Sequence, residues 1–264
     1  MRITATIQAR MGSSRLPGKV IKPICGKPML AWQIERIKRS RIIDEIVVAT
    51  TTSFNDNVIK NLTDELNVQC YRGPEDDVLG RIAQVMKEFN VDIHVELIGD
   101  SPLTDPQIVD EILAFYIKNR NQFDYVANGM RSTYPSGMEV SVYEGRKLIE
   151  LEREVSPNDP MREHVEVHLS KNSNLSRCNI AAPSWFYAPN LFLEVDTKVD
   201  FEMISLIIEH FVRLDANHFS LSQILDYINQ HPEIAEINRS EHRRWRELKP
   251  ELSGIVDTEK GVLT

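Results

Sequence analysis

A cationic loop rich in small residues follows the first apolar run of this 264-residue chain. Residues 7–19 read IQARMGSSRLPGK, so Arg10, Arg15 and Lys19 alternate with residues that leave backbone N–H groups accessible. Asp and Glu are absent from the first 34 positions, where their overall frequency would place about five. Backbone N–H groups at a strand-to-helix loop, together with mobile cations, bind phosphate oxygens. The loop therefore predicts a binding site for the phosphates of a nucleoside triphosphate.

Two named phosphate-binding motifs do not fit this loop. The P-loop has four residues between its glycines and Ser or Thr after its lysine, whereas GSSRLPGKV has five residues and then Val20. The dinucleotide fingerprint GxGxxG does not occur in the sequence. The small residues Gly12, Ser13, Ser14 and Gly18 still allow several N–H groups to converge on phosphate. The alternative interpretation is a solvated cationic loop at the surface.

Two aspartates come directly after apolar runs that we interpret as strands. Asp100 lies in IGDSPLTDP, and Asp196 lies in FLEVDTKVDFE. Parallel strands present their carboxyl ends at one edge of the sheet, and α/β proteins bind ligands there. Two carboxylates at that edge can hold one or two Mg²⁺ ions against a triphosphate. The structural alternatives are a turn at GDSP and a capping box from Thr197 to Asp200.

Other polar clusters give weaker indications of chemistry. His164 and His168 are four residues apart, but HVEVH also alternates like a strand and lacks the HExxH order, so zinc is disfavoured. Three consecutive acids, residues 75–77, are typical of a helix entry, with Arg81 one turn inside the helix. The sequence has no Gly-x-Ser-x-Gly elbow and no other arrangement that indicates covalent catalysis.

The elements that must position these residues alternate as in a βαβ series with a mainly parallel sheet. We expect strands at residues 3–9, 45–51, 68–73, 93–99 and 125–129. We expect helices to begin near Pro28, Asn55, Asp77 and Asp105. The last helix is the best marked, because Asp105 can cap it and Pro106 can occupy its first turn.

The alternation fails after Gly129, and we interpret residues 130–190 approximately as an insertion. The apolar run LFLEVD, beginning at Leu191, then predicts a strand followed by a helix, and both rejoin the first part of the chain. Another helix is expected at 220–231. We expect one domain over residues 1–238 and a peripheral tail over 239–264 that includes the basic run HRRWR.

The composition excludes several classes of protein. A net charge of −8 argues against a general polynucleotide binder, which needs a broad cationic surface. Three scattered cysteines without a CxxC spacing predict neither a disulfide framework nor a thiolate metal site. The N-terminal apolar run is too short for a signal peptide, and no run of about 18 apolar residues predicts a membrane span. A cytoplasmic location is therefore expected.

Eight motifs in this order resemble the cytidylyltransferase family, which includes spore coat polysaccharide biosynthesis F-like proteins and the CMP-sialic acid and CMP-KDO synthetases. They are QARMGSSRLPGK, GKPML, RGPEDDVLGR, GDSPLTDP, YPSGMEV, REHV, VDTKVDFE and HPEIAEIN, over about residues 3–238. The first motif is highly specific, whereas DTxxD and GDxP support it only in combination. The resemblance implies a nucleotide-diphospho-sugar transferase fold, a Rossmann-like α/β/α sandwich, with a β-rich insertion that commonly forms a homodimer. It also implies that a sugar oxygen attacks the α-phosphate of a nucleoside triphosphate and that pyrophosphate leaves.

The resemblance also implies roles for particular residues. The nucleotide-binding positions are Ala9, Arg10, Met11, Gly12, Ser13, Ser14, Arg15, Lys19 and Arg81, with Ala9 and Arg10 offering backbone contacts to the base. The catalytic positions are Arg10, Arg15, Lys19 and Asp100. The Mg²⁺ ligands are Asp100 and Asp196. The positions that face the sugar are Tyr134, Glu139, Arg162 and His164.

The sequence leaves the substrates open. Ile98 stands where CMP-KDO synthetases have glutamine, and Glu96 stands where spore-coat-type members often have arginine. Transfer of CMP from CTP to a sugar acid of the ulosonic or sialic type is the favoured activity. The alternatives are a sugar 1-phosphate nucleotidyltransferase that uses GTP or UTP, and a non-catalytic nucleotide-binding scaffold. A glycosyltransferase is disfavoured, because no DxD motif follows an apolar strand.

Overall fold

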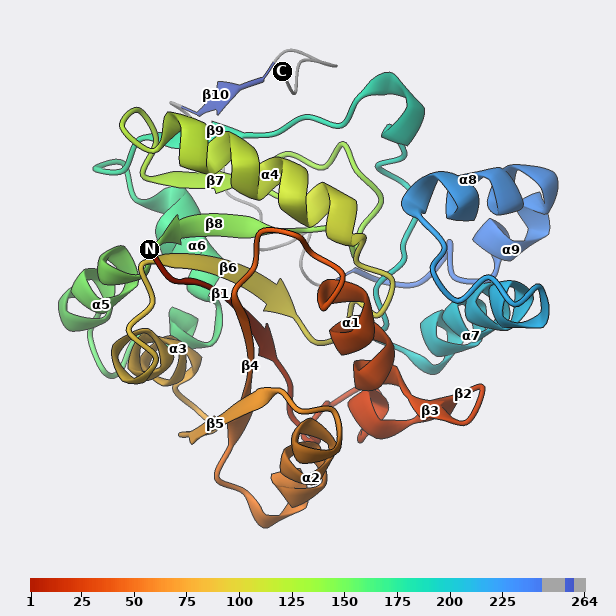
Figure 1. Ribbon diagram of the computed structural model, residues 1–264, viewed down its shortest axis with the longest axis horizontal. Helices are drawn as coiled ribbons and strands as arrows, with labels where there is room; N and C mark the ends of the chain where they lie inside the picture. Colours follow the sequence, from red (N-terminus) through yellow and green to blue (C-terminus); the bar gives the residue numbers. More distant parts are fainter. Residues whose placement is uncertain (244–254, 259–264) are drawn as a thin grey trace.

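A mostly parallel sheet forms the centre of the computed structural model, which describes residues 1–243 and 255–258. Within these residues, eight strands form one sheet in the order β10-β9-β7-β8-β6-β1-β4-β5, with β10 and β5 at its two edges (Figure 1). The strands of this sheet are β1 (Ile3–Gln8), β4 (Glu45–Thr51), β5 (Gln69–Gly73), β6 (Ile93–Ile98), β7 (Tyr125–Ala127), β8 (Ser141–Glu144), β9 (Arg177–Asn179) and β10 (Val256–Asp257). Only β8 is antiparallel to its neighbours in this sheet. The five strands expected before residue 130 are confirmed.

Helices cover both faces of the sheet. They are α1 (Met29–Ile37), α2 (Asn57–Glu65), α3 (Val78–Glu88), α4 (Pro106–Asn119), α5 (Gly145–Glu154), α6 (Val165–Lys171), α7 (Lys198–Arg213), α8 (Leu221–Gln230) and α9 (Pro232–Glu236). The short turns of 3-10 helix are η1 (Lys19–Ile21), η2 (Phe54–Asp56), η3 (Pro160–Glu163) and η4 (Ser184–Phe186), and β2 (Pro23–Ile24) pairs with β3 (Lys27–Pro28) in a small hairpin. The start of α4 is as expected, because the Asp105 carboxylate accepts a hydrogen bond from the backbone N–H of Gln107.

The two faces of the sheet follow from the alternation of side chains along each strand. Ala5 and Ile7 of β1 pack with α1, α4 and α7 on one face. Val47 and Ala49 of β4 pack with α3, α5 and α6 on the other face. Burial on both faces explains why these strands are continuous apolar runs in the sequence.

Residues 130–190 differ from the expected β-rich insertion. They contain the helices α5 and α6, and their two short strands, β8 and β9, join the main sheet. The run HVEVH enters a helix rather than a strand, because Val165 and Leu169, four residues apart, share the face that packs into the core. The β-rich description is therefore wrong for this segment, whereas the mainly parallel α/β fold is confirmed.

The expected strand after Leu191 is also wrong. Residues 191–196 make a single bridge, between Phe192 and Ser136, and no ladder with the sheet. The backbone N–H of Val195 instead donates to the carbonyl of Asp100, at 2.8 Å. The segment is extended because it pairs with loops, so the sheet does not fix Asp196 in the way that it fixes Asp100.

The expected peripheral tail needs a correction for its described residues. Val256 and Asp257 form β10, which pairs with β9 at the sheet edge (Figure 1). Arg243 is only 3% exposed and forms ion pairs inside the protein. Residues 244–246 of the HRRWR run lie outside the described residues. Among the described helices, none combines the length and the apolar character that crossing a bilayer requires.

Candidate active site

The cationic loop begins where β1 ends, at the carboxyl edge of the sheet. Met11 organises it: its N–H donates to the buried Asp56 carboxylate at 2.8 Å, and its carbonyl accepts from the N–H groups of Ser13 and Gly18, each at 2.9 Å. The Ser13 hydroxyl accepts a hydrogen bond from the N–H of Leu16. The loop is thus held by hydrogen bonds between its own residues.

Two glycines permit this closed shape. Gly18 has φ of 69°, a left-handed conformation that glycine adopts without strain. Gly12 lies against Glu75, since an added Cβ would lie 2.9 Å from the carboxylate. Among the described residues, no acceptor is recorded for the N–H groups of Gly12, Ser14 and Arg15. These groups are therefore available to an anion, and phosphate binding by this loop stays a prediction.

Lys19 lies at the centre of the site and is 9% exposed. Its ammonium contacts Asp100 Oδ2 and Asp196 Oδ1, each at 3.1 Å, and donates to the carbonyl of Val195 at 2.6 Å. Burial alone would lower the pKa of Lys19, but the charges of Asp100 and Asp196 raise it above its ordinary value. The lysine is therefore a fixed cation, and it joins carboxylates that are 96 positions apart in the sequence.

Backbone hydrogen bonds bring the two aspartates together. The N–H of Gly99 donates to the carbonyl of Gln8 at 2.8 Å, which places Asp100 beside the start of the cationic loop. The carbonyl of Asp100 in turn accepts the N–H of Val195, next to Asp196. The guanidinium of Arg15 lies 2.6 Å from Asp196 Oδ2. The expected grouping of Arg15, Lys19 and the two aspartates is thus present in the structure.

The two carboxylates suit a hard divalent cation shared with a substrate. Asp100 and Asp196 already converge on one positive centre, the Lys19 ammonium, at equal distances. Mg²⁺ accepts a few carboxylate oxygens and completes its shell with phosphate and water. Within the described residues no group of three or more His, Cys, Asp or Glu side chains could hold a metal alone. The donor set therefore fits a Mg²⁺ ion that takes its remaining ligands from water or from phosphate oxygens.

Arg10 and Arg81 lie near each other and contact other groups than the two aspartates. Arg10 is about one-third exposed, with its guanidinium 4.0 Å from Glu163. Arg81 is buried and donates from Nη1 to the carbonyls of Pro74 and Glu75 at 2.6 and 3.4 Å. Burial, with a smaller effect from Arg10, lowers the pKa of Arg81. Arg81 therefore holds the segment that contacts Gly12, whereas Arg10 is partly exposed and lies near Glu163.

The residues expected near the sugar have diverse environments. Glu139 accepts the N–H of Gly137 at 2.6 Å, and Tyr134 is 4% exposed with burial raising its pKa. Arg162 makes two 2.9 Å hydrogen bonds to Asp77, the N-cap of α3, and lies 3.4 Å from Glu152. His164 precedes α6. Arg162 thus ties η3 to α3 and α5, a structural contact that the sequence did not indicate.

Two buried carboxylates, Asp56 and Glu96, make contacts that sequence reasoning did not predict. Asp56 anchors Met11 and also accepts hydrogen bonds from the N–H and the hydroxyl of Thr51. Glu96 is buried between Gln8 and Tyr143, which donate to its two oxygens at 2.7 and 2.9 Å. No local pattern marks Asp56, because its partners are 5 and 45 positions away.

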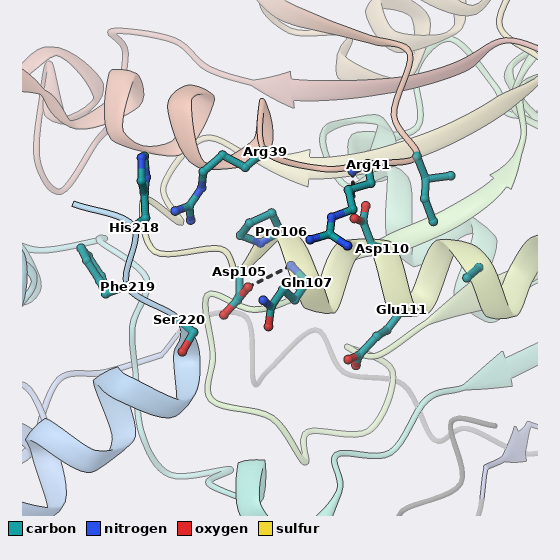
Figure 2. A pocket seen from close by; sticks show the side chains of 12 residues that line it. Arg39, Arg41, Asp105, Pro106, Gln107, Asp110, Glu111, His218, Phe219 and Ser220 are labelled. Atoms are coloured by element: carbon teal, nitrogen blue, oxygen red, sulfur yellow. Dashed lines mark hydrogen bonds between the residues drawn. The ribbon is translucent and has the colours of Figure 1, made fainter. Parts of the chain in front are cut away.

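A separate groove of about 610 Å³ is lined by residues that follow α1, by the first part of α4 and by residues that precede α8 (Figure 2). Figure 2 shows Arg41 beside Asp110 and Arg39 above Asp105, whereas Glu111 points away from both arginines. Asp105 caps two helices here, since its oxygens accept the N–H groups of Gln107 and Leu221 at 2.9 and 2.5 Å. None of the cationic-loop residues lines this groove. The mixed charges and the helix caps indicate a structural junction rather than the active site.

A mostly parallel sheet whose first loop faces two carboxylates is the arrangement of a nucleotidyltransferase. The profile of the cytidylyltransferase family matches residues 4–203, and the chain belongs to this family. A solved structure of a cytidylyltransferase from Leptospira borgpetersenii superimposes with a TM-score of 0.82 at 27% identity, covering 92% of this chain and 99% of that one.

Three proteins are similar to this chain in sequence. An uncharacterised protein of Methanocaldococcus jannaschii is 32% identical over 94% of this chain and 100% of its own length. The spore coat polysaccharide biosynthesis protein SpsF of Bacillus subtilis is 29% identical over 87% of this chain and 95% of its own. The 3-deoxy-manno-octulosonate cytidylyltransferase of Geobacter sulfurreducens is 36% identical over 45% of this chain and 47% of its own.

Proposed function

We propose that this protein transfers the CMP group of CTP to an acidic sugar of the ulosonic or sialic type, releases pyrophosphate, and serves surface polysaccharide or glycan assembly. The observation that carries the proposal is the convergence of Arg15 and Lys19 on Asp100 and Asp196 beside available loop N–H groups. Membership of the cytidylyltransferase family supports CTP as the donor. The relatives named for a sugar-acid cytidylyltransferase and for spore coat polysaccharide support the acceptor class and the pathway class.

The residues present perform this reaction by positioning and by neutralising charge. The loop N–H groups, Arg15 and Lys19 bind the β- and γ-phosphates, so positive charge lies where the leaving pyrophosphate develops negative charge. Asp100 and Asp196 would hold Mg²⁺, which supplies further neutralisation of phosphate charge when it is bound. Lys19 exchanges its carboxylate partners for phosphate oxygens when the triphosphate enters.

The acceptor side completes the scheme. The sugar hydroxyl attacks the α-phosphorus, the bond from that phosphorus to pyrophosphate breaks, and the hydroxyl proton passes to a carboxylate or to water. We assign the nucleoside side to Arg10 and the backbone of Ala9, and the sugar side to Tyr134, Glu139 and His164. The proposal includes a homodimer formed through residues 130–190 and a cytoplasmic location.

The test is pyrophosphate release from each of the four ribonucleoside triphosphates with Mg²⁺, using sugar acids and sugar 1-phosphates as acceptors. Release that needs both CTP and a sugar acid supports the proposal. Release with GTP or UTP and a sugar 1-phosphate contradicts it in favour of the second kind of transferase, and nucleotide binding without release with any acceptor favours a scaffold. The Lys19→Ala variant should be inactive but folded, whereas the surface variant Lys60→Ala should keep wild-type turnover.

A further inference from the structure

The segment that carries Asp196 is held from the C-terminal side of the protein rather than by the sheet. We propose that Arg243 is a positioning residue for Asp196 and acts through the buried carboxylate of Asp200. The inference rests on the proposed function, because it takes Asp196 as a ligand of Mg²⁺. Arg243 lies beyond residues 4–203, the part of the chain that the family profile matches.

Asp200 is the link between the two residues. Its carboxylate is 0% exposed, and Oδ2 accepts the backbone N–H groups of Asp196 and Thr197 at 3.0 and 2.8 Å. The Thr197 hydroxyl completes a capping box at the start of α7. The capping box that the sequence offered as an alternative to a metal site is therefore present, and it fixes the backbone of the proposed metal ligand.

Arg243 and Asn238 form what we call the C-terminal clasp. Arg243 Nη2 and Asn238 Nδ2 both donate to Asp200 Oδ1, each at 2.8 Å. The Arg243 guanidinium lies 4.4 Å from the ring centre of Phe192, and its Nη1 lies 3.3 Å from Glu194 Oε1. Asn238 also donates to the Phe192 carbonyl at 3.0 Å. The clasp thus contacts both ends of the segment from Phe192 to Asp200.

This fastening matters because the segment belongs to no strand ladder, and its other described backbone contacts are with loop residues and with Lys19. Phe192 makes the single bridge of residues 191–196, so a strand ladder does not set the position of Asp196. A buried carboxylate is costly without hydrogen-bond donors, and Arg243 supplies one of the two donors to Asp200 Oδ1. Arg243 thereby holds the orientation in which Oδ2 accepts the N–H of Asp196, and its loss would weaken the backbone anchor of Asp196.

The cationic loop contacts the same region. Arg15 donates from Nη1 to the carbonyl of His242 at 3.3 Å and lies 2.6 Å from Asp196 through Nη2. His242, which precedes Arg243, therefore contacts the arginine that we assign to phosphate binding. If the C-terminal clasp is displaced, we expect CTP affinity in the presence of Mg²⁺ to fall more than CTP affinity in its absence, because the loop N–H groups remain in place.

The experiment measures CTP affinity by isothermal titration with and without Mg²⁺, in the full-length protein and without acceptor, so that no turnover occurs. The quantity of interest is the factor by which Mg²⁺ tightens CTP binding. For Arg243→Met we expect this factor to fall by about tenfold, as for residues that orient metal ligands. The metal-free affinity is expected to stay within about twofold of the wild type, because the loop N–H groups are retained.

Two further variants make the result specific. Arg239→Met removes a surface arginine that pairs with Glu236, and we expect wild-type values for it. Arg243→Lys keeps a positive charge, so it serves as the test if the methionine variant does not fold. For this variant we expect the factor by which Mg²⁺ tightens CTP binding to fall by about threefold. The reason is that one ammonium cannot reach both Asp200 and Glu194 as the two arms of the guanidinium do.

The outcomes separate the two proposals. A wild-type Mg²⁺ factor in every folded Arg243 variant overturns the positioning role alone. Equal weakening with and without Mg²⁺ also overturns it, because that is the result of general loss of structure. Absence of any Mg²⁺ effect on CTP binding in the wild type overturns the metal assignment in the proposed function and, with it, this inference.

Discussion

Replacing Lys19 by methionine tests the electrostatic arrangement of the site most directly. Lys19 is the cation that lies between Asp100 and Asp196, and its ammonium is 3.1 Å from an oxygen of each. These two carboxylate oxygens are therefore at most about 6 Å apart. Two unit charges at that separation repel by about 3 kcal/mol at an effective dielectric constant near 20.

The net cost of Lys19→Met is smaller than this repulsion. Arg15 remains 2.6 Å from Asp196 and offsets part of it. We expect a loss of about 2 kcal/mol in the free energy of unfolding, which corresponds to a fall of about 4–8 °C in Tm for a chain of this size. Millimolar Mg²⁺ should recover most of the loss in the variant without nucleotide, because the divalent ion replaces the missing cation between the two carboxylates.

Thermal and urea unfolding with and without Mg²⁺ measure both effects. The matched control is Lys60→Met, which removes one partner of an exposed ion pair with Asp64 and should change the free energy of unfolding by less than about 1 kcal/mol. An unchanged Tm for Lys19→Met would refute the electrostatic reasoning. A loss that Mg²⁺ does not reverse would refute the convergence of the two carboxylates on a shared cation.

Two further predictions concern the buried groups Asp56 and His94. Asp56→Ala removes the acceptor of the Met11 N–H, so it should lower the free energy of unfolding by about 1–3 kcal/mol and raise the KM for CTP, as measured by unfolding and by steady-state kinetics. Unchanged values of both would contradict the anchoring role of Asp56. Burial lowers the pKa of His94 to about 3, whereas the unfolded chain takes up this proton below its ordinary value of 6.5. Stability should therefore fall as the pH drops from 6.5 toward 3, with this group contributing up to about 1.4 kcal/mol per pH unit, and urea unfolding at several pH values should show a shallower slope for His94→Gln. An equal slope in that variant would assign the acid sensitivity to other groups.

Local patterns in the sequence were sufficient for several elements of the fold. The apolar run before Arg10 and the cap at Asp105 each depend on residues within a few positions, so β1 and the start of α4 were predicted correctly. The loop that follows β1 was predicted for a similar reason, because its glycines and cations are contiguous. The run HVEVH was ambiguous, because its valines fit a strand and its i, i+4 spacing fits a helix, and only packing against the core selected the helix.

Contacts between distant residues decided the rest. Phe192 and its neighbours have the composition of a strand, but their backbone groups pair with loops and with Asp100, so the sequence pattern alone was misleading. Arg243 stands in a basic, polar run that is typical of a solvated tail, yet its charge is neutralised inside the protein by Asp200. An ion pair across 43 positions leaves no periodic trace in the sequence.

The sequence by itself determined the cationic, glycine-rich character of the loop, the mainly parallel sheet and the family of the protein, because each depends on contiguous residues or on short-range periodicity. The tertiary structure decided how the two aspartates meet at Lys19 and how Asp196 is held. Backbone carbonyls, buried carboxylates and a C-terminal arginine make those contacts. Their energies depend on burial and on distance in space, and neither quantity is fixed by separation along the chain.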